Sequence, residues 1–461
     1  MIRALWFIVK LAVVVAAAIW LAERPGTVAL DWEGWNVAMP FGVFVLVALA
    51  ALAAAALGYR YLRALGHLPG RMRRASGRRK RERGYKALTQ GMVAVAAGDA
   101  AAATRFARQA DVLLKDPPLT MLLSAQAAQL NGDEDAARRY FKAMLERPET
   151  AFLGTRGLLT QALRHGEQHD ALELARRANQ LQPRTPWVLL TLTDLEARAG
   201  DWAAAEQTLQ QAINAGAVPA AEGRHRRAAL LVERSIEAEA RGRSEAAVTH
   251  AQTAVDLEPG FAPAVARLSR LQVKAGRPKR GAKAIEKAWR LAPHPLLADA
   301  YTEMLTAYDP QVRYRMMQKL VSSHPGVEAE LVLARAAMDT GEWTDARAHL
   351  NRALTEEPSA RVLRLMAELE EAEHANPDGA RDWLAKAAGA PPSPAWTCRE
   401  CGDVKMEWRA LCRNCGGVDS LEWKVPTAAV HPPALVEETL TTLPPGALPP
   451  SRAPVMVEAT K

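Results

Sequence analysis

Aromatic residues are scarce in this chain, and cysteine is confined to one short segment. Phe, Trp and Tyr make up 6% of the 461 residues, while the apolar fraction of 49% is rich in alanine and leucine. Strands favour aromatic and β-branched side chains, whereas alanine and leucine favour helices, so the composition argues against an all-β architecture and predicts a helical protein. The large apolar fraction also excludes a wholly disordered chain.

Charged residues are absent from Gly34 to Tyr59, and most of this stretch is continuous apolar sequence. Twenty residues of helix cover the roughly 30 Å hydrocarbon core of a bilayer. We therefore expect a membrane span at about residues 39–58. We expect another at about residues 4–22, where Lys10 interrupts the apolar run. A cleavable signal peptide is the alternative interpretation of this N-terminal stretch.

Most of the net charge of +8 lies in one segment. Residues 59–83 hold ten Lys and Arg against a single acid, Glu82, so the rest of the chain is close to neutral. No aromatic stacking pattern accompanies the basic run, and we expect no nucleic-acid partner. The positive-inside rule instead predicts a transmembrane hairpin at residues 1–58 and a basic juxtamembrane stem at 59–83 near anionic lipids, with everything after the stem in the cytoplasm.

The sequence after the stem repeats with a period of 34 residues. Glycines that follow apolar helical stretches mark the period at Gly98, Gly132, Gly166 and Gly200. Five positions after each glycine stands an alanine, where two antiparallel helices can approach closely: Ala103, Ala137, Ala171 and Ala205. Prolines close the later units at Pro259, Pro293, Pro325, Pro358 and Pro392.

This pattern resembles the tetratricopeptide repeat (TPR), in which helical hairpins stack into a superhelix. About nine units fit into residues 84–392, which we expect to form a TPR-like α-solenoid that binds protein partners on its concave face. By repeat phase, the residues expected to face this groove are Arg156, Asp194 and Arg335.

All four cysteines lie in the segment CRECGDVKMEWRALCRNC, in the pattern CxxC, ten residues, CxxC. We expect the four thiolates Cys398, Cys401, Cys412 and Cys415 to bind zinc in a small zinc ribbon at residues 393–425. Iron in a rubredoxin-like site is the alternative metal. Disulfides are disfavoured by the expected cytoplasmic location. Four protein thiolates leave no open position for substrate, so the site is expected to be structural rather than catalytic.

Common catalytic motifs are absent from the sequence. It contains no P-loop, no GxGxxG fingerprint and no Ser/His/Asp set. We therefore expect no catalytic residues and a protein that is not an enzyme. Residues 426–461 are rich in proline and lack a period, which predicts a disordered tail.

The order of these parts resembles the HemY family of proteobacterial inner-membrane proteins, in the version with a C-terminal zinc ribbon. The segments that carry the resemblance are PGTVALDW (25–32), FLGTRGLL (152–159), APHPLLADAY (292–301), LARAAMDTGEWTDARAHL (333–350), RLMAELEEAEH (364–374) and DWLAKA (382–387). The implied fold is all-α, with two N-terminal transmembrane helices, a TPR-like solenoid and a small four-cysteine module.

The resemblance implies a role in late haem biosynthesis, at or near protoporphyrin, as a multi-pass inner-membrane scaffold that binds pathway enzymes or membrane partners. It does not imply the flavoprotein oxidase that shares the HemY name in other bacteria, because no dinucleotide fingerprint is present. Direct contact with porphyrin or haem is left open. The cysteine knuckles also resemble those of the lipopolysaccharide assembly protein B family, so an envelope-assembly or proteolysis adaptor is the alternative.

Overall fold

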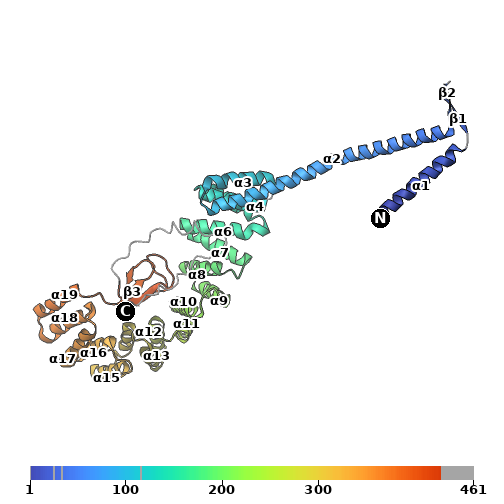
Figure 1. Cartoon of the computed structure of the whole chain (residues 1–461). Helices are drawn as coiled ribbons and strands as arrows, with labels where there is room; N and C mark the ends of the chain where they lie inside the picture. Colours follow the sequence, from blue (N-terminus) through green and yellow to red (C-terminus); the bar gives the residue numbers. More distant parts are fainter. Residues whose placement is uncertain (1, 24–25, 33–34, 115–116, 427–461) are drawn as a thin grey trace. The chain divides into compact units, whose positions relative to one another are not determined.

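The computed structural model describes residues 2–23, 26–32, 35–114 and 117–426, and these are mostly helical (Figure 1). Two compact units are present: residues 1–89 with 108–115, and residues 90–107 with 116–461. The strands are β1 (Thr27–Trp32), β2 (Trp35–Pro40), β3 (Ala395–Cys398), β4 (Val404–Lys405) and β5 (Leu421–Lys424). The expected tail lies outside the described residues from residue 427 onward.

The helices in chain order are α1 (Ile2–Ala22), α2 (Phe41–Ala96), α3 (Ala100–Leu114), α4 (Pro117–Leu130), α5 (Glu134–Met144), α6 (Pro148–His165), α7 (Gln168–Leu181), α8 (Pro186–Arg198), α9 (Trp202–Asn214), α10 (Ala220–Ala240), α11 (Ser244–Leu257), α12 (Ala262–Lys274), α13 (Pro278–Leu291), α14 (Pro295–Met304), α15 (Pro310–Val321), α16 (Val327–Thr340), α17 (Trp343–Glu356), α18 (Ala360–His374) and α19 (Pro377–Gly389).

The first unit contains one segment that is long and apolar enough to cross a membrane among the described residues, Phe41–Arg60, whose mean hydropathy is 2.5. It begins two residues later than the span expected from the sequence, because Met39 and Pro40 belong to β2. Between α1 and α2 the chain forms an antiparallel hairpin, β1 with β2, that the sequence did not indicate. The backbone N–H of Phe41 donates to the carbonyl of Gly26 at 2.8 Å. Helix α2 therefore starts directly at the end of the hairpin that lies away from its turn.

The second unit is an array of helical hairpins, which confirms the TPR-like solenoid. Neighbouring helices pair along the chain, as in α6 with α7, α8 with α9 and α10 with α11. The periodic glycines adopt the left-handed conformation that ends a helix, with φ between +70° and +77° at Gly98, Gly132, Gly166 and Gly200. The alanines five positions after each of them are fully buried, as expected where two helices approach closely.

Two hairpins lack a turn glycine, and the structure closes them by other means. Helix α18 is capped at its C-terminus by Ala375, a non-glycine residue that adopts the left-handed conformation with φ +48°. Helix α15 instead starts on an N-cap, where the carboxylate of Asp309 accepts a hydrogen bond from the backbone N–H of Gln311 at 2.9 Å. The period therefore continues through the two units that lack a turn glycine.

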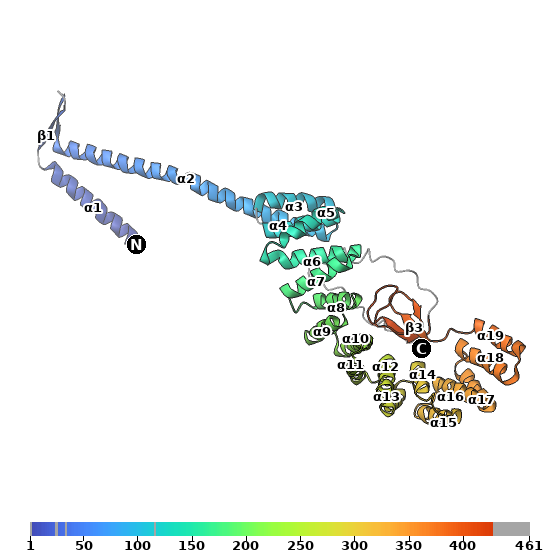
Figure 2. The same ribbon diagram turned by 180° about the vertical axis from the view of Figure 1, so that it is seen from behind.

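The C-terminal strands form a three-stranded sheet in the order β4-β3-β5, with β3 antiparallel to both neighbours. Both views place this module on the inner side of the array, beside α8 and α12 (Figures 1 and 2). The hydrophobic core of the array's second half also contains module residues, among them Trp396, Cys398, Trp408 and Leu421. The cysteine module therefore shares a core with the helices.

Candidate metal centre and its attachment to the helical array

The cysteines stand on two turns of the same shape. Strand β3 ends on Cys398, the first cysteine of the first turn, and Cys412 begins the second. The N–H of Gly402 donates to the carbonyl of Cys398 at 2.9 Å, and the N–H of Gly416 donates to that of Cys412 at 2.8 Å. These glycines have φ of +73° and +71°, a conformation that L side chains rarely adopt. The glycine after each CxxC is therefore required by the turn.

The two turns bring the four sulfur atoms together. The Sγ atoms of Cys398, Cys401, Cys412 and Cys415 all lie within 4.8 Å of one another. Across the turns, the Sγ atoms of Cys398 and Cys415 are 3.6 Å apart, and those of Cys401 and Cys412 are 3.8 Å apart. A tetrahedral ion with metal–sulfur bonds of about 2.3 Å separates its sulfurs by about 3.8 Å. The cluster therefore has the dimensions to bind a metal.

The thiols differ in their tendency to ionise. Burial opposes ionisation of Cys398, but hydrogen bonds from the Ser420 hydroxyl and from the backbone outweigh it and lower the pKa of this thiol to about 7. Burial raises the pKa of Cys412 and of Cys415. Four thiolates in so small a volume repel one another unless a cation lies between them. The arrangement is therefore that of a site in which four thiolates bind a metal ion.

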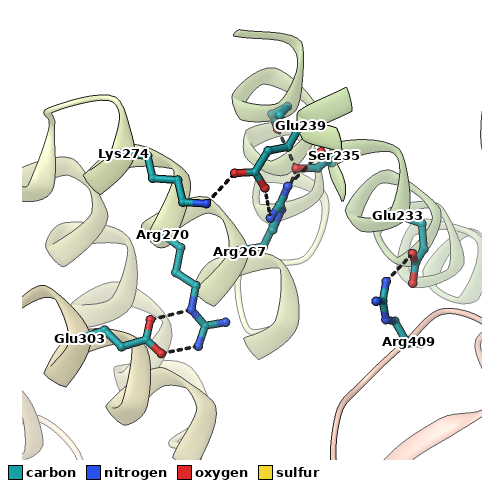
Figure 3. Close-up of polar contacts among 9 residues, drawn as sticks. Glu233, Ser235, Glu239, Arg267, Arg270, Lys274, Glu303 and Arg409 are labelled. Atoms are coloured by element: carbon teal, nitrogen blue, oxygen red, sulfur yellow. Dashed lines mark hydrogen bonds and ion pairs between the residues drawn. The ribbon is translucent and has the colours of Figure 1, made fainter. Parts of the chain in front are cut away.

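A buried carboxylate on α10 attaches the module to the array. The side chain of Glu233 is almost completely buried and accepts a hydrogen bond from the backbone N–H of Ala410 at 3.0 Å. Its other oxygen pairs with the guanidinium of Arg409 at 3.3 Å (Figure 3). Both partners lie in the loop between the two CxxC turns, so this one acid holds the loop that leads into the second pair of cysteines.

Aromatic contacts continue the attachment next to Glu233. Phe261, just before α12, meets the ring of Trp408 edge to face with the ring centroids 5.0 Å apart, and the ring centroid of His225 of α10 also lies 5.0 Å from that of Phe261. The imidazole of His225 is 3.5 Å from the carboxylate of Asp419, whose pKa is raised by burial. Arg198 of α8 donates to the carbonyl of Gly416 at 2.9 Å.

A third attachment point is His294, at the start of α14. Its ring stacks on Trp396 at 5.2 Å and lies 4.6 Å from Trp423. Its Nδ1 accepts the backbone N–H of Leu296 at 3.0 Å and so caps the helix. Burial, with a smaller contribution from the charge of Arg361, lowers the pKa of His294 to about 4, so the ring is neutral at physiological pH.

Ion pairs link successive inner helices of the array. The partners stand 32 or 33 positions apart, about one repeat, so each pair joins equivalent positions of adjacent units. These pairs are Asp194–Arg226, Arg270–Glu303, Glu328–Arg361 and Arg335–Glu368. Figure 3 shows Arg270 with Glu303 beside a second group, in which Glu239 accepts from Arg267 and Lys274. The inner face therefore carries alternating charges that are largely paired.

The three residues expected in the groove lie on different helices and are not brought together. Arg156 of α6 places its guanidinium 5.3 Å from the ring of Trp187. Asp194 of α8 pairs with Arg226 at 2.7 Å, beside the cysteine module. Arg335 of α16 pairs with Glu368 at 2.5 Å and lines a hollow between α14, α15 and α16.

Sequence reasoning did not find Glu233, Phe261 or His294. Each stands at an ordinary position of a helical repeat, and none belongs to a motif that indicates a bound partner. Only the segment APHPLLADAY, which contains His294, was noted in the sequence, as one of the segments that resemble the HemY family. The sequence also places a charged residue, Glu233, on the buried face of the amphipathic helix α10. A charged residue at such a position indicates a buried partner.

Comparisons with known proteins give one family match and one relative over nearly the whole length. The relative is "Probable magnetosome protein Mms48" of Magnetospirillum gryphiswaldense, 26% identical over 457 residues, which cover 96% of this chain and 98% of that one. Among solved structures, a tetratricopeptide repeat protein from Parabacteroides merdae is 15% identical with a TM-score of 0.26, covering 54% of this chain and 98% of its own. MamA is 20% identical with a TM-score of 0.24, covering 36% and 91%.

The family model is described as the HemY protein N-terminus, and it matches residues 26–132. This region comprises the β1–β2 hairpin, the membrane-span candidate with its helical extension, and the first helices of the array. Residues 26–132 are therefore similar to the N-terminal region of HemY proteins, in agreement with the resemblance found in the sequence.

Proposed function

We propose that this protein is a non-enzymatic scaffold of the bacterial inner membrane that acts in late haem biosynthesis. The observation that carries the proposal is the HemY match at residues 26–132, on a chain that continues into a TPR-like array. Two spans, α1 and Phe41–Arg60, would anchor it, with the array in the cytoplasm. Anchoring raises the local concentration of bound enzymes, so the scaffold changes pathway flux without chemistry of its own.

The proposed partner site is the exposed part of the inner face. Arg335 stands there in a hollow with Asp299, Arg313, Met317 and Arg361, a mixture of charges and apolar surface that fits a protein segment. Arg156 and Asp194 would extend this site toward the N-terminal repeats. Replacing Arg335 with Glu should weaken capture of partners crosslinked in membranes. The control is Arg364→Glu, which changes an exposed cation of α18 outside the hollow.

The proposed metal is zinc, bound by the four thiolates, with iron as the alternative. Four sulfur ligands in a closed site suit either ion, and a bound ion would stabilise a module that has few strands of its own. Elemental analysis of protein purified from its native membranes distinguishes the two ions. Iron also gives thiolate-to-metal absorption bands in the visible region, which zinc lacks.

The pathway role is tested by deleting the gene and measuring porphyrins and haem. We expect porphyrin intermediates to accumulate and haem to fall, with recovery by the wild-type chain and weaker recovery by Arg335→Glu. Unchanged porphyrin and haem pools would contradict the proposed role while leaving the scaffold architecture untouched.

A second candidate function is favoured by the relative of matching length. Mms48 is described as a probable magnetosome protein, and 98% of its length aligns with this chain. A scaffold that organises proteins on a membrane, including an adaptor for envelope assembly or proteolysis, has the same architecture. In that case the deletion strain would have normal porphyrins, and its envelope composition or membrane protein levels would change instead.

A further inference from the structure

Helix α13 carries a dense basic face on the outer side of its hairpin. The exposed side chains of this helix include five cations: Lys279, Arg280, Lys283, Lys287 and Arg290. At 100° per residue these positions fall within an arc of about 100°. The opposite face is buried and holds Ile285, Ala288 and Trp289. The five cations therefore project together from a helix whose orientation is fixed by its core contacts.

These cations are not neutralised within the protein. Among the described residues, none of the five forms an ion pair with an acid, although such pairs are frequent elsewhere in the array. The one acid on this side of the helix, Glu286, is half-buried and accepts a hydrogen bond from the hydroxyl of Tyr301. Helix α15, which contacts α13, adds the exposed cations Arg315 and Lys319.

The basic face is not a general property of the repeats. The equivalent helix of the preceding hairpin, α11, contains Glu245 and Asp256 and no Lys or Arg. An array with near-neutral charge thus gathers five unpaired cations on one helix face, where they bind an anionic partner more strongly than the net charge indicates.

We propose that the α13 face is a docking surface for anionic lipid headgroups, in addition to the membrane-span candidate. That segment, Phe41–Arg60, keeps a bilayer at high effective concentration around the array. Helix α13 exposes no aromatic ring for stacking on bases, because its single aromatic residue, Trp289, is fully buried. Leu291, at the end of the same helix, is 58% exposed and provides an apolar side chain beside the cations.

This surface goes beyond the proposed function and does not depend on a role in haem biosynthesis. Each Lys or Arg close to an anionic bilayer strengthens binding about fivefold. Contact through α13 would make the position of the array sensitive to the anionic lipid content of the membrane. The membrane-span candidate, which is uncharged from Phe41 to Tyr59, has no such sensitivity.

The test uses the full chain reconstituted in nanodiscs of neutral phosphatidylcholine, so that the apolar span is already occupied. Vesicles containing phosphatidylglycerol are then added, and bound protein is measured by co-sedimentation against vesicles of phosphatidylcholine alone. The test variant is Lys279→Glu, Lys283→Glu, Lys287→Glu. The matched control is Arg177→Glu, Arg184→Glu, Arg364→Glu, which makes the same charge change at exposed, scattered positions. The basic stem is intact in both variants.

We expect the α13 variant to lose at least about tenfold in binding to anionic vesicles and the control to lose less than about threefold. Circular dichroism and bound metal should be unchanged in both, because every substituted side chain is exposed. Equal losses in the two variants would overturn the proposal, since binding would then follow net charge alone. Undiminished vesicle binding, with loss of binding to an RNA homopolymer or to polyglutamate, would also overturn it.

Discussion

The carboxylate of Glu233 accepts the backbone N–H of Ala410, a residue 177 positions later in the chain, at 3.0 Å. A backbone N–H cannot be removed by substitution, so the contact depends on the acid alone. The second carboxylate oxygen is satisfied by Arg409, which leaves no part of this buried group unpaired. Glu233 therefore fixes where the cysteine module sits on the array, and the first prediction concerns this residue.

Replacing Glu233 with Ala should destabilise the attachment of the cysteine module. The substitution leaves a buried N–H at Ala410 without its acceptor, which costs about 1–3 kcal/mol. The midpoint temperature of thermal unfolding of the full chain in detergent should therefore fall. Glu368→Ala is the control, because the Arg335–Glu368 pair is half-exposed and such pairs contribute about 0–1 kcal/mol. Equal shifts in both variants would show that Glu233 has no special role.

Replacing Cys398 and Cys412 with Ser should abolish binding of the proposed metal and loosen neighbouring helices. The module shares a core with α10, α12 and α14, so its unfolding exposes Phe261 and His294. Hydrogen–deuterium exchange should rise in those three helices. Exchange in α5 to α7 should stay unchanged, because their cores lie in separate clusters. If exchange rises nowhere outside the module, the shared core does not couple the two parts.

Stability should fall as the pH is lowered toward 4. The pKa of His294 is lowered from 6.5 to about 4 in the folded protein. As the pH falls, this histidine is therefore protonated in the unfolded chain before it is protonated in the folded one. The contribution of neutral His294 to the free energy of unfolding is fully present above pH 6.5. It is lost as the pH falls from 6.5 to about 4, and the loss is up to about 3 kcal/mol. Protonation would also remove the Nδ1 acceptor that caps α14.

His294→Asn is the variant that isolates this effect, because asparagine caps a helix but does not titrate. Its stability between pH 4 and pH 6.5 should vary less than that of the wild type, as measured by urea unfolding at fixed pH values. If both proteins show the same slope in this range, the pH dependence arises elsewhere.

Replacing Gly154 with Ala should destabilise the contact between α5 and α6. A Cβ atom at this position would lie 2.6 Å from the carbonyl oxygen of Phe141 and 3.0 Å from the Cβ of Met144. Overpacking of this kind costs about 1–3 kcal/mol. Gly77→Ala is the control, because a Cβ there meets nothing within 4 Å and should be neutral or slightly stabilising. Differential scanning calorimetry of both variants checks the expected difference.

The repeat could be predicted from the sequence because its determinants are local. A glycine at φ near +72° and an alanine five residues later act within a single hairpin, so Gly132 and Ala137 identify their turn without knowledge of the rest of the fold. The motif FLGTRGLL is explained in the same way, because Gly154 is where two helix backbones come close.

The attachment of the cysteine module could not be predicted, because it depends on side chains distant in the sequence. The spacing of the cysteines indicates the metal cluster, and the sulfur atoms indeed lie together. Nothing in the pattern shows that Trp408 packs on Phe261 or that Trp396 stacks on His294. These contacts arise only when the curvature of the array presents the ends of several helices to one surface.

The distance in sequence between Glu233 and Ala410 sets an order of events during synthesis. At 5–20 residues per second, the ribosome needs on the order of ten to thirty seconds to make the segment that separates them. For that interval α10 is complete while its acid, and the rings of Phe261 and His294, await their partners. The nascent chain therefore exposes these groups, and is open to aggregation, while the residues between Glu233 and Ala410 are being translated.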